Sequence, residues 1–160
     1  MRSAHLAQDY IPSSKLAIIG DGPIEIREKL DSLIENLGLG QNIIRFGWMS
    51  NDKYVVMKQS KFFIFPSFSD AFALSVCEAM ACQLPVISYD LPQFREHYGK
   101  GIIRVEKGNV EKLAQAVRML LGNRDMLEKL GFDAFEQSKE YNLDKAAKEE
   151  LQIIMEKFPV

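Results

Sequence analysis

The sequence predicts an α/β fold with a doubly wound parallel sheet of about five strands and helices on both faces. Short apolar runs of strand length alternate with segments whose apolar residues follow helical spacing. Glycine or polar residues come directly after several of these runs, where a strand would turn into a helix. Because parallel α/β sheets bind ligands at the carboxyl ends of their strands, these turns are the first places to look for a site.

The first strand is expected at Lys15–Ile19, and a glycine-rich turn follows it at residues 20–23. Gly20 and Gly22 allow a tight turn and a close approach of the backbone to a ligand. Pro23 suits the first position of a helix. Gly20 and Gly22 are therefore candidate ligand contacts, and a plain strand-to-helix turn is the alternative.

The next unit is a helix and a second strand. Helical spacing covers Ile24–Leu37 and ends at Gly38, a residue typical of a helix C-cap. Asn42–Phe46 is the second strand, and its turn leads into a helix that Ser50 or Asn51 can cap.

The central unit is a strand, a helix and a strand. Phe62–Phe65 and Leu84–Ser88 read as strands, and the apolar helix between them is expected to be buried. Its few polar residues, Ser75, Glu78 and Cys82, are three and then four positions apart, so they share one face. This helix starts at the carboxyl end of a strand, where a ligand would bind.

Two acidic side chains belong to this unit. Asp70 lies just before the helix, whose first backbone N–H groups have no partner within the helix and can bind a phosphate. Glu78 needs a cation, a crevice or a ligand hydroxyl, because an unpaired buried charge is strongly unfavourable. The alternatives are that Asp70 caps the helix and that Glu78 is a buried structural ion pair.

The last third of the chain is expected to cover the sheet. Gln93–Tyr98 reads as a short surface helix, and Gly101–Val105 is the last strand. Three amphipathic helices follow, at Val110–Leu121, Met126–Ser138 and Leu143–Phe158.

Composition excludes several classes of protein. The chain has 160 residues, with 20 Lys and Arg against 22 Asp and Glu, so it carries no electrostatic footprint for nucleic acid. No apolar run approaches the roughly 20 residues that span a bilayer, and the N-terminus does not resemble a signal peptide. These features predict a cytoplasmic domain.

Cysteine and histidine do not form a metal or redox motif. Cys77 and Cys82 are five residues apart on the predicted buried helix, a spacing that fits neither a disulfide within that helix nor a metal site. His5 and His97 stand apart from any cluster of ligand residues. We therefore expect two core thiols and no metal.

An ordered set of motifs resembles a known family. Asp70 is followed after seven residues by Glu78–Ala81 and then by Pro85–Ile87. This pattern resembles the family 4 retaining glycosyltransferases of the GT-B fold, whose signature is an acidic residue, seven residues and a Glu, continuing into Glu-Ala-Met-Ala and Pro-Val-Ile. Three further segments fit the family in the expected order: Leu16–Pro23, Ile44–Gly47 and Tyr141–Leu143.

The resemblance implies that residues 1–160 form the Rossmann-like donor-binding domain, the C-terminal half of a GT-B enzyme. Such an enzyme moves a glycosyl group, with retention at the anomeric carbon, from a nucleoside diphosphate sugar to a glycan, lipid or small molecule. The donor is a substrate, and neither a cofactor nor a metal is implied.

The resemblance also assigns roles to residues. Asp70 would hold hydroxyls of the sugar and Glu78 those of the ribose, since a carboxylate accepts two hydrogen bonds from a diol. Met49 and Asn51 would border the base, with helix capping by Ser50 or Asn51 as the alternative. The diphosphate leaving group would be stabilised by four backbone amides, those of Phe72, Ala73, Leu74 and Ser75.

The chain departs from the family pattern around this helix. Asp70 stands where the family usually has Glu, Ala71 and Ala73 stand in place of a Gly-Phe-Gly, and Gln83 replaces a common Gly. Alanine is expected to keep the turn at negative φ.

The family's donor domain has parts that these residues do not carry: a first strand with an Arg/Lys loop, and the acceptor-binding half. We therefore expect a piece of a longer chain that is inactive by itself, whose sheet closes differently or borrows a strand, giving a homo-oligomer or a strand swap. The full enzyme could associate with the inner face of a membrane. A non-catalytic nucleotide-binding or interaction module, or a relative of nucleotide-sugar epimerases or phosphorylases, is the alternative.

Overall fold

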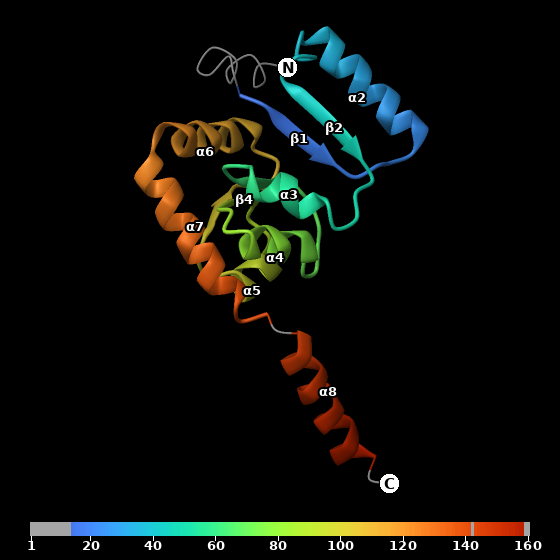
Figure 1. Cartoon of the computed structure of the whole chain (residues 1–160), viewed down its shortest axis with the longest axis vertical. Coiled ribbons are helices and arrows are strands. Elements are labelled where there is room, and N and C mark those ends of the chain that lie inside the picture. The colour runs from blue at the N-terminus through green and yellow to red at the C-terminus, as the bar shows by residue number, and fades with distance from the viewer. Residues whose placement is uncertain (1–13, 142, 159–160) are drawn as a thin grey trace.

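The computed structural model describes residues 14–141 and 143–158, and it contains every strand and helix expected within them (Figure 1). A helix end that could precede the first strand, at Arg2–Tyr10, lies outside the described residues. The strands are β1 (Leu16–Ile19), β2 (Ile43–Gly47), β3 (Phe63–Phe65), β4 (Val86–Tyr89) and β5 (Ile102–Val105). The helices are α2 (Ile24–Asn36), α3 (Lys53–Lys58), α4 (Leu74–Ala81), α5 (Pro92–His97), α6 (Val110–Gly122), α7 (Arg124–Ser138) and α8 (Leu143–Lys157).

The five strands form two parallel sheets instead of one. β1 pairs with β2, and β3, β4 and β5 pair in that order. Within the described residues, β1 and β3 each keep one edge without a strand partner. The parallel α/β class is confirmed.

β4 is the centre of the core. All four of its residues are buried, with β3 on one side and β5 on the other. Val86 packs in a cluster with Val76 of α4, whereas the next residue, Ile87, packs in a second cluster with Leu120 of α6. Because successive residues of a strand point to opposite faces, helices cover both faces of this sheet, as predicted.

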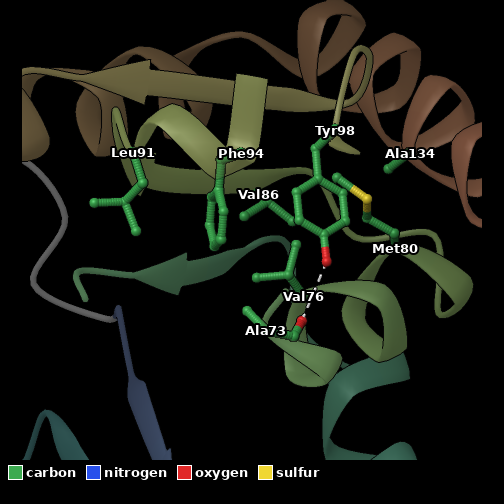
Figure 2. Close-up of a cluster of buried hydrophobic side chains, with 8 residues drawn as sticks. All are labelled: Ala73, Val76, Met80, Val86, Leu91, Phe94, Tyr98 and Ala134. Carbon is green, nitrogen blue, oxygen red and sulfur yellow. Dashed lines mark hydrogen bonds between the residues drawn. The ribbon is translucent and has the colours of Figure 1, made fainter. Parts of the chain in front are cut away.

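The expectation of a surface helix at Gln93–Tyr98 is wrong for one face of α5. Phe94 and Tyr98 are fully buried in the same cluster as Val76 and Met80 (Figure 2). Phe94 lies within α5, and Tyr98 is its C-cap residue four positions later, and both side chains reach the same cluster. The polar residues between them led to the surface assignment, although two buried aromatic residues suffice to anchor one helical turn.

Two glycines allow α7 to approach the core closely. A Cβ at Gly131 would lie 2.7 Å from the carbonyl oxygen of Gln83, just after α4. At Gly101, whose φ is +68°, a Cβ would lie 2.3 Å from the backbone nitrogen of Ala134. Any larger residue would push α7 away from the sheet.

The unit of β1, α2 and β2 stands apart from the rest of the chain (Figure 1). Neither strand contains a fully buried residue, and α2 has none either. Ile26 and Leu33, on the predicted apolar side of α2, are about half exposed. The helix expected from this spacing is present, and its other apolar positions, Leu30, Ile34 and Leu37, are only half-buried.

The last helix, α8, extends away from the body (Figure 1). It exposes apolar side chains that include Leu151, Met155 and Phe158. No helix among the described residues is long and apolar enough to cross a membrane.

Candidate functional site

The loop before α4 is organised by Asp70. Its Oδ1 accepts hydrogen bonds from the backbone N–H groups of Phe72, at 3.0 Å, and of Ala73, at 2.6 Å. The N-cap position of α4 is Ala73, three residues later. Asp70 therefore shapes the turn before α4, and the alternative that it caps the helix is wrong. Its Oδ2 forms no hydrogen bond with the described residues.

This arrangement divides the four predicted amide donors into two pairs. Phe72 and Ala73 donate to Asp70 and are occupied within the chain. The N–H groups of Leu74 and Ser75, the first two residues of α4, form no hydrogen bond with the described residues. The open amino end of the helix thus offers two donors beside the free oxygen of Asp70.

The expectation that alanine keeps this turn at negative φ is wrong. Ala73 has φ 52° and ψ 75°, in the left-handed region, and Gln83 at the other end of α4 has φ 63°. Among the described residues these are the two non-glycine positions with positive φ. Ala73 adopts this conformation because the bonds from its own N–H and from Phe72 to Asp70 fix the direction of the chain entering the helix.

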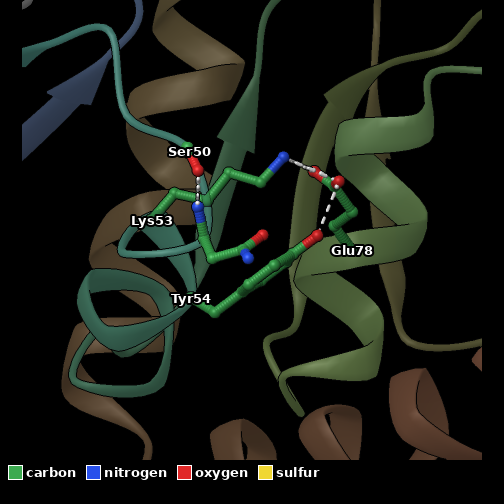
Figure 3. A network of polar contacts seen from close by, with 5 residues as sticks. Ser50, Lys53, Tyr54 and Glu78 are labelled. Carbon is green, nitrogen blue, oxygen red and sulfur yellow. Dashed lines mark hydrogen bonds and ion pairs between the residues drawn. The ribbon is translucent and has the colours of Figure 1, made fainter.

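Glu78 is paired with a cation at the edge of the site (Figure 3). Lys53 Nζ lies 2.7 and 2.9 Å from its two carboxylate oxygens, and the Tyr54 hydroxyl donates to Oε1 at 3.0 Å. The side chains of Lys53 and Glu78 are 26% and 28% exposed, so the pair is accessible to solvent. The hydrogen bond with Glu78 raises the pKa of Lys53 and also that of Tyr54.

The turn after β2 lies next to this pair, because Lys53 is the first residue of α3. Met49 and Asn51 belong to this turn, where the N–H of Asn51 donates to Ser50 Oγ at 2.6 Å. Neither Ser50 nor Asn51 caps α3 through its side chain, since the N-cap residue is Asp52 and forms no such bond. The capping alternative is therefore wrong for this helix.

The turn after β1 is joined to the turn after β2. The N–H of Gly20, at φ +118°, donates to the carbonyl oxygen of Gly47 at 2.8 Å. The N–H of Gly22 donates to Asp21 Oδ1 at 2.9 Å. The structure therefore brings Gly20 to the end of β2, but no hydrogen bond or ion pair of the described residues joins Gly20 or Gly22 to α4.

The candidate site does not coincide with either of two hollows found on the described surface. Those hollows, of about 360 and 420 Å³, lie along α8 and α2 and are not lined by Asp70 or Glu78. Residues 14–141 and 143–158 contain no cluster of side chains that could hold a metal ion. The thiols of Cys77 and Cys82 are free and half-buried, and burial raises the pKa of both.

Sequence reasoning missed three residues of this region. Lys53 and Tyr54 bind Glu78, and Tyr98 bonds to the loop before α4. A signal for Lys53 was present, because Glu78 required a partner and Lys53 starts the helix at the carboxyl end of β2. No sequence signal identified Tyr98, which the expected surface helix placed in solvent.

The family model described as glycosyl transferases group 1 matches residues 3–137. The chain belongs to this family. An uncharacterized glycosyltransferase of Methanocaldococcus jannaschii is 37% identical over 90 residues, which are 56% of this chain and 21% of the relative. The poly(glycerol-phosphate) alpha-glucosyltransferase of Bacillus subtilis is 30% identical over 145 residues, covering 89% of this chain and 21% of the relative.

Solved glycosyltransferases of the GT-B fold share the architecture. HepE of Anabaena, in complex with UDP-glucose, superposes with a TM-score of 0.85 at 18% identity, covering 96% of this chain and 44% of its own. This similarity shows the fold. The chain spans about a fifth of the length of the two relatives above.

Proposed function

We propose that residues 1–160 are the donor-binding domain of a retaining, hexosyltransferase-type enzyme that transfers a glycosyl group from a nucleoside diphosphate sugar to an acceptor. One observation carries the proposal: the open amino end of α4 follows the carboxyl end of β3, with Asp70 just before it and Glu78 about one turn into the helix. HepE, a neighbour of the same fold, was solved with UDP-glucose, which supports a nucleotide sugar as donor.

The leaving group would be stabilised at the helix end. When the bond between the anomeric carbon and the diphosphate breaks, negative charge builds up on the phosphate oxygens. The amides of Leu74 and Ser75 are free to donate to these oxygens, and the helix dipole adds a favourable field. Asp70 keeps Oδ2 for a sugar hydroxyl while its Oδ1 holds the loop.

Glu78 would bind the ribose hydroxyls at the other end of the donor. Because Lys53 and Tyr54 occupy the carboxylate, a ribose diol must share or displace these contacts. The nearby turn that holds Met49 and Asn51 would border the base, and Gly20 and Gly22 would lie at the edge of the bound nucleotide. Neither carboxylate acts as a nucleophile in this proposal.

Isothermal titration with UDP, GDP and their sugars tests the function. The wild-type chain is expected to bind at least one nucleotide sugar more tightly than the free sugar. Asp70→Ala and Glu78→Ala should each weaken that affinity by about tenfold, which corresponds to about one hydrogen bond to a charged group. Unchanged affinity in both variants would contradict the site, and no binding by the wild type would contradict the function.

A non-catalytic binding module is the second candidate, and the Lys53–Glu78 pair favours it, because this pair satisfies the carboxylate without a ligand. Titration identifies an interaction module, which would keep its fold and bind no nucleotide sugar. A non-catalytic nucleotide-binding module would bind the nucleotide sugar, but the full-length protein would transfer nothing to an acceptor. A nucleotide-sugar epimerase relative would bind the donor and change the configuration of its sugar with no acceptor present.

We also infer that the isolated chain does not transfer sugar, because catalysis requires an acceptor held in line with the donor. The open edges of β1 and β3 support the hypothesis that the chain forms homo-oligomers or swaps strands. Light scattering at high concentration tests this, and a strictly monomeric chain would contradict it. A cytoplasmic location, at the inner face of a membrane for the full enzyme, stays a prediction.

A further inference from the structure

The Tyr98 hydroxyl is directed at the loop that precedes α4. It donates a hydrogen bond to the carbonyl oxygen of Phe72 and lies 3.4 Å from that of Ala73 (Figure 2). Cys77 Sγ is 3.2 Å from the same hydroxyl. Because a phenol has a single proton to donate, the Cys77 thiol is the donor in this third contact.

The loop before α4 needs a hydrogen-bond donor for its carbonyl groups, because its turn is strained. A left-handed conformation is unfavourable for alanine, and Ala73 adopts it at φ 52°. On the amide side, Asp70 accepts from Phe72 and Ala73. On the carbonyl side, Tyr98 is the donor that reaches Phe72, so the strained turn is held from both sides.

Tyr98 is a rigid support for this bond. Its side chain is fully buried, and its ring packs against those of Phe94, Phe72 and Tyr141, with centroids 5.1, 6.0 and 5.6 Å away. Burial raises the pKa of Tyr98, so the phenol keeps its proton. The hydroxyl therefore acts as a fixed donor attached to the core.

We propose that Tyr98 is a positioning residue, which holds the turn at Phe72 and Ala73 so that the amides of Leu74 and Ser75 stay open to the diphosphate. The proposal rests on the proposed function for its ligand, but its statement about the loop does not. It assigns Tyr98 a role that neither the motif Asp70–Glu78 nor the expected surface helix indicated.

Tyr98→Phe tests the proposal, with Tyr141→Phe as the matched control. Both changes remove one hydroxyl from the same aromatic cluster, but the Tyr141 hydroxyl donates to the carbonyl oxygen of His97, outside the loop. Tyr98→Phe is expected to weaken the affinity for the best nucleotide sugar by about fivefold, the loss of about one neutral hydrogen bond. Tyr141→Phe is expected to change it by less than twofold.

Glycine at position 73 provides a rescue. Glycine adopts positive φ without strain, so the turn then needs less support. The effect of Tyr98→Phe on affinity is expected to fall from about fivefold to less than twofold when it is measured in an Ala73→Gly background. A purely structural role of the hydroxyl in the core would give the same loss in both backgrounds and would overturn the proposal.

Amide hydrogen exchange measures the loop without any ligand. Tyr98→Phe is expected to raise the exchange rates of the Phe72 and Ala73 amides severalfold, and to leave those of β4 unchanged. Unchanged rates in the loop would overturn the proposal even if nucleotide sugars bind. Faster loop exchange in a chain that binds no nucleotide sugar would instead overturn the proposed function alone.

The variant is expected to fold, because the phenylalanine ring keeps the ring contacts of Tyr98. Thermal unfolding checks this. A Tyr98→Phe variant that does not fold would also overturn the proposal, since the hydroxyl would then support the whole core and not the loop in particular.

Discussion

The ion pair between Lys53 and Glu78 allows the ribose role of Glu78 to be separated from a structural one. The perturbation is a double-mutant cycle of Lys53→Met, Glu78→Gln and both together. Lys53 Nζ makes two close contacts with the carboxylate, but both side chains are about one quarter exposed. Exposed pairs contribute about 0.2–1 kcal/mol and hydrogen bonds to charged groups about 1.5–3 kcal/mol, so we expect a coupling of about 1 kcal/mol in unfolding.

The affinity for the donor is expected to move in opposite directions in the two single variants. Glu78→Gln removes the carboxylate that accepts from the ribose diol and should weaken binding by about tenfold. Lys53→Met frees that carboxylate, so the ligand no longer competes with an ion pair of about 1 kcal/mol, and binding should tighten by about fivefold.

Urea unfolding gives the coupling in stability, and isothermal titration with the best nucleotide sugar gives the affinities. The double variant should bind like Glu78→Gln alone, because the freed side chain is then an amide. If Lys53→Met weakens binding, or Glu78→Gln leaves it unchanged, the assignment of Glu78 to the ribose is wrong.

Three further predictions concern stability. Gly101→Ala should lower the free energy of unfolding in urea by more than about 3 kcal/mol, since its Cβ would overlap the backbone of α7. The control Gly38→Ala, which has open space around it at φ +64°, should lower it by only about 1 kcal/mol. Asn123→Ala should lower stability by about 1 kcal/mol, because its side chain accepts from the N–H at the start of α7, and thermal unfolding would show no change if this cap is unimportant. The hydrogen bond from Arg95 lowers the pKa of Asp90, so the ionised Asp90 stabilises the folded chain fully above about pH 4, and this contribution is lost as the pH falls further. Arg95→Met removes the contribution, so the pH midpoint of acid unfolding should rise.

Much of the fold could be predicted from the sequence because its signals are local. Apolar runs such as Phe62–Phe65 and Leu84–Ser88 define strands by their length and flanking turns. Helical spacing defined α6 and α7, and Gly38 marked the end of α2. The division into two sheets depends on pairing between distant strands, and it became visible only in three dimensions.

The placement of the candidate residues in the fold was predictable from the sequence, but their contacts were less so. The motif placed Asp70 just before a helix and Glu78 about one turn into it, as the structure has them. The partners Lys53 and Tyr98 come from positions about 25 residues away along the chain, and periodicity carries no information about such pairs. The left-handed turn at Ala73 was mispredicted, because residue preference was outweighed by the hydrogen bonds that the Phe72 and Ala73 N–H groups donate to Asp70.

The close approach of α7 to the sheet also affects how this chain can fold during its synthesis. Gly131 and Ala134 lie against the backbone near Gln83 and Gly101, so the three-stranded core is completed by residues made long after its strands. A ribosome that has released only the first 120 or so residues would hold a sheet with α4 and α6 on its two faces but without α7, which packs against both of these helices. Until α7 emerges from the exit tunnel, the surfaces of α4 and α6 that it contacts would stay open to other chains.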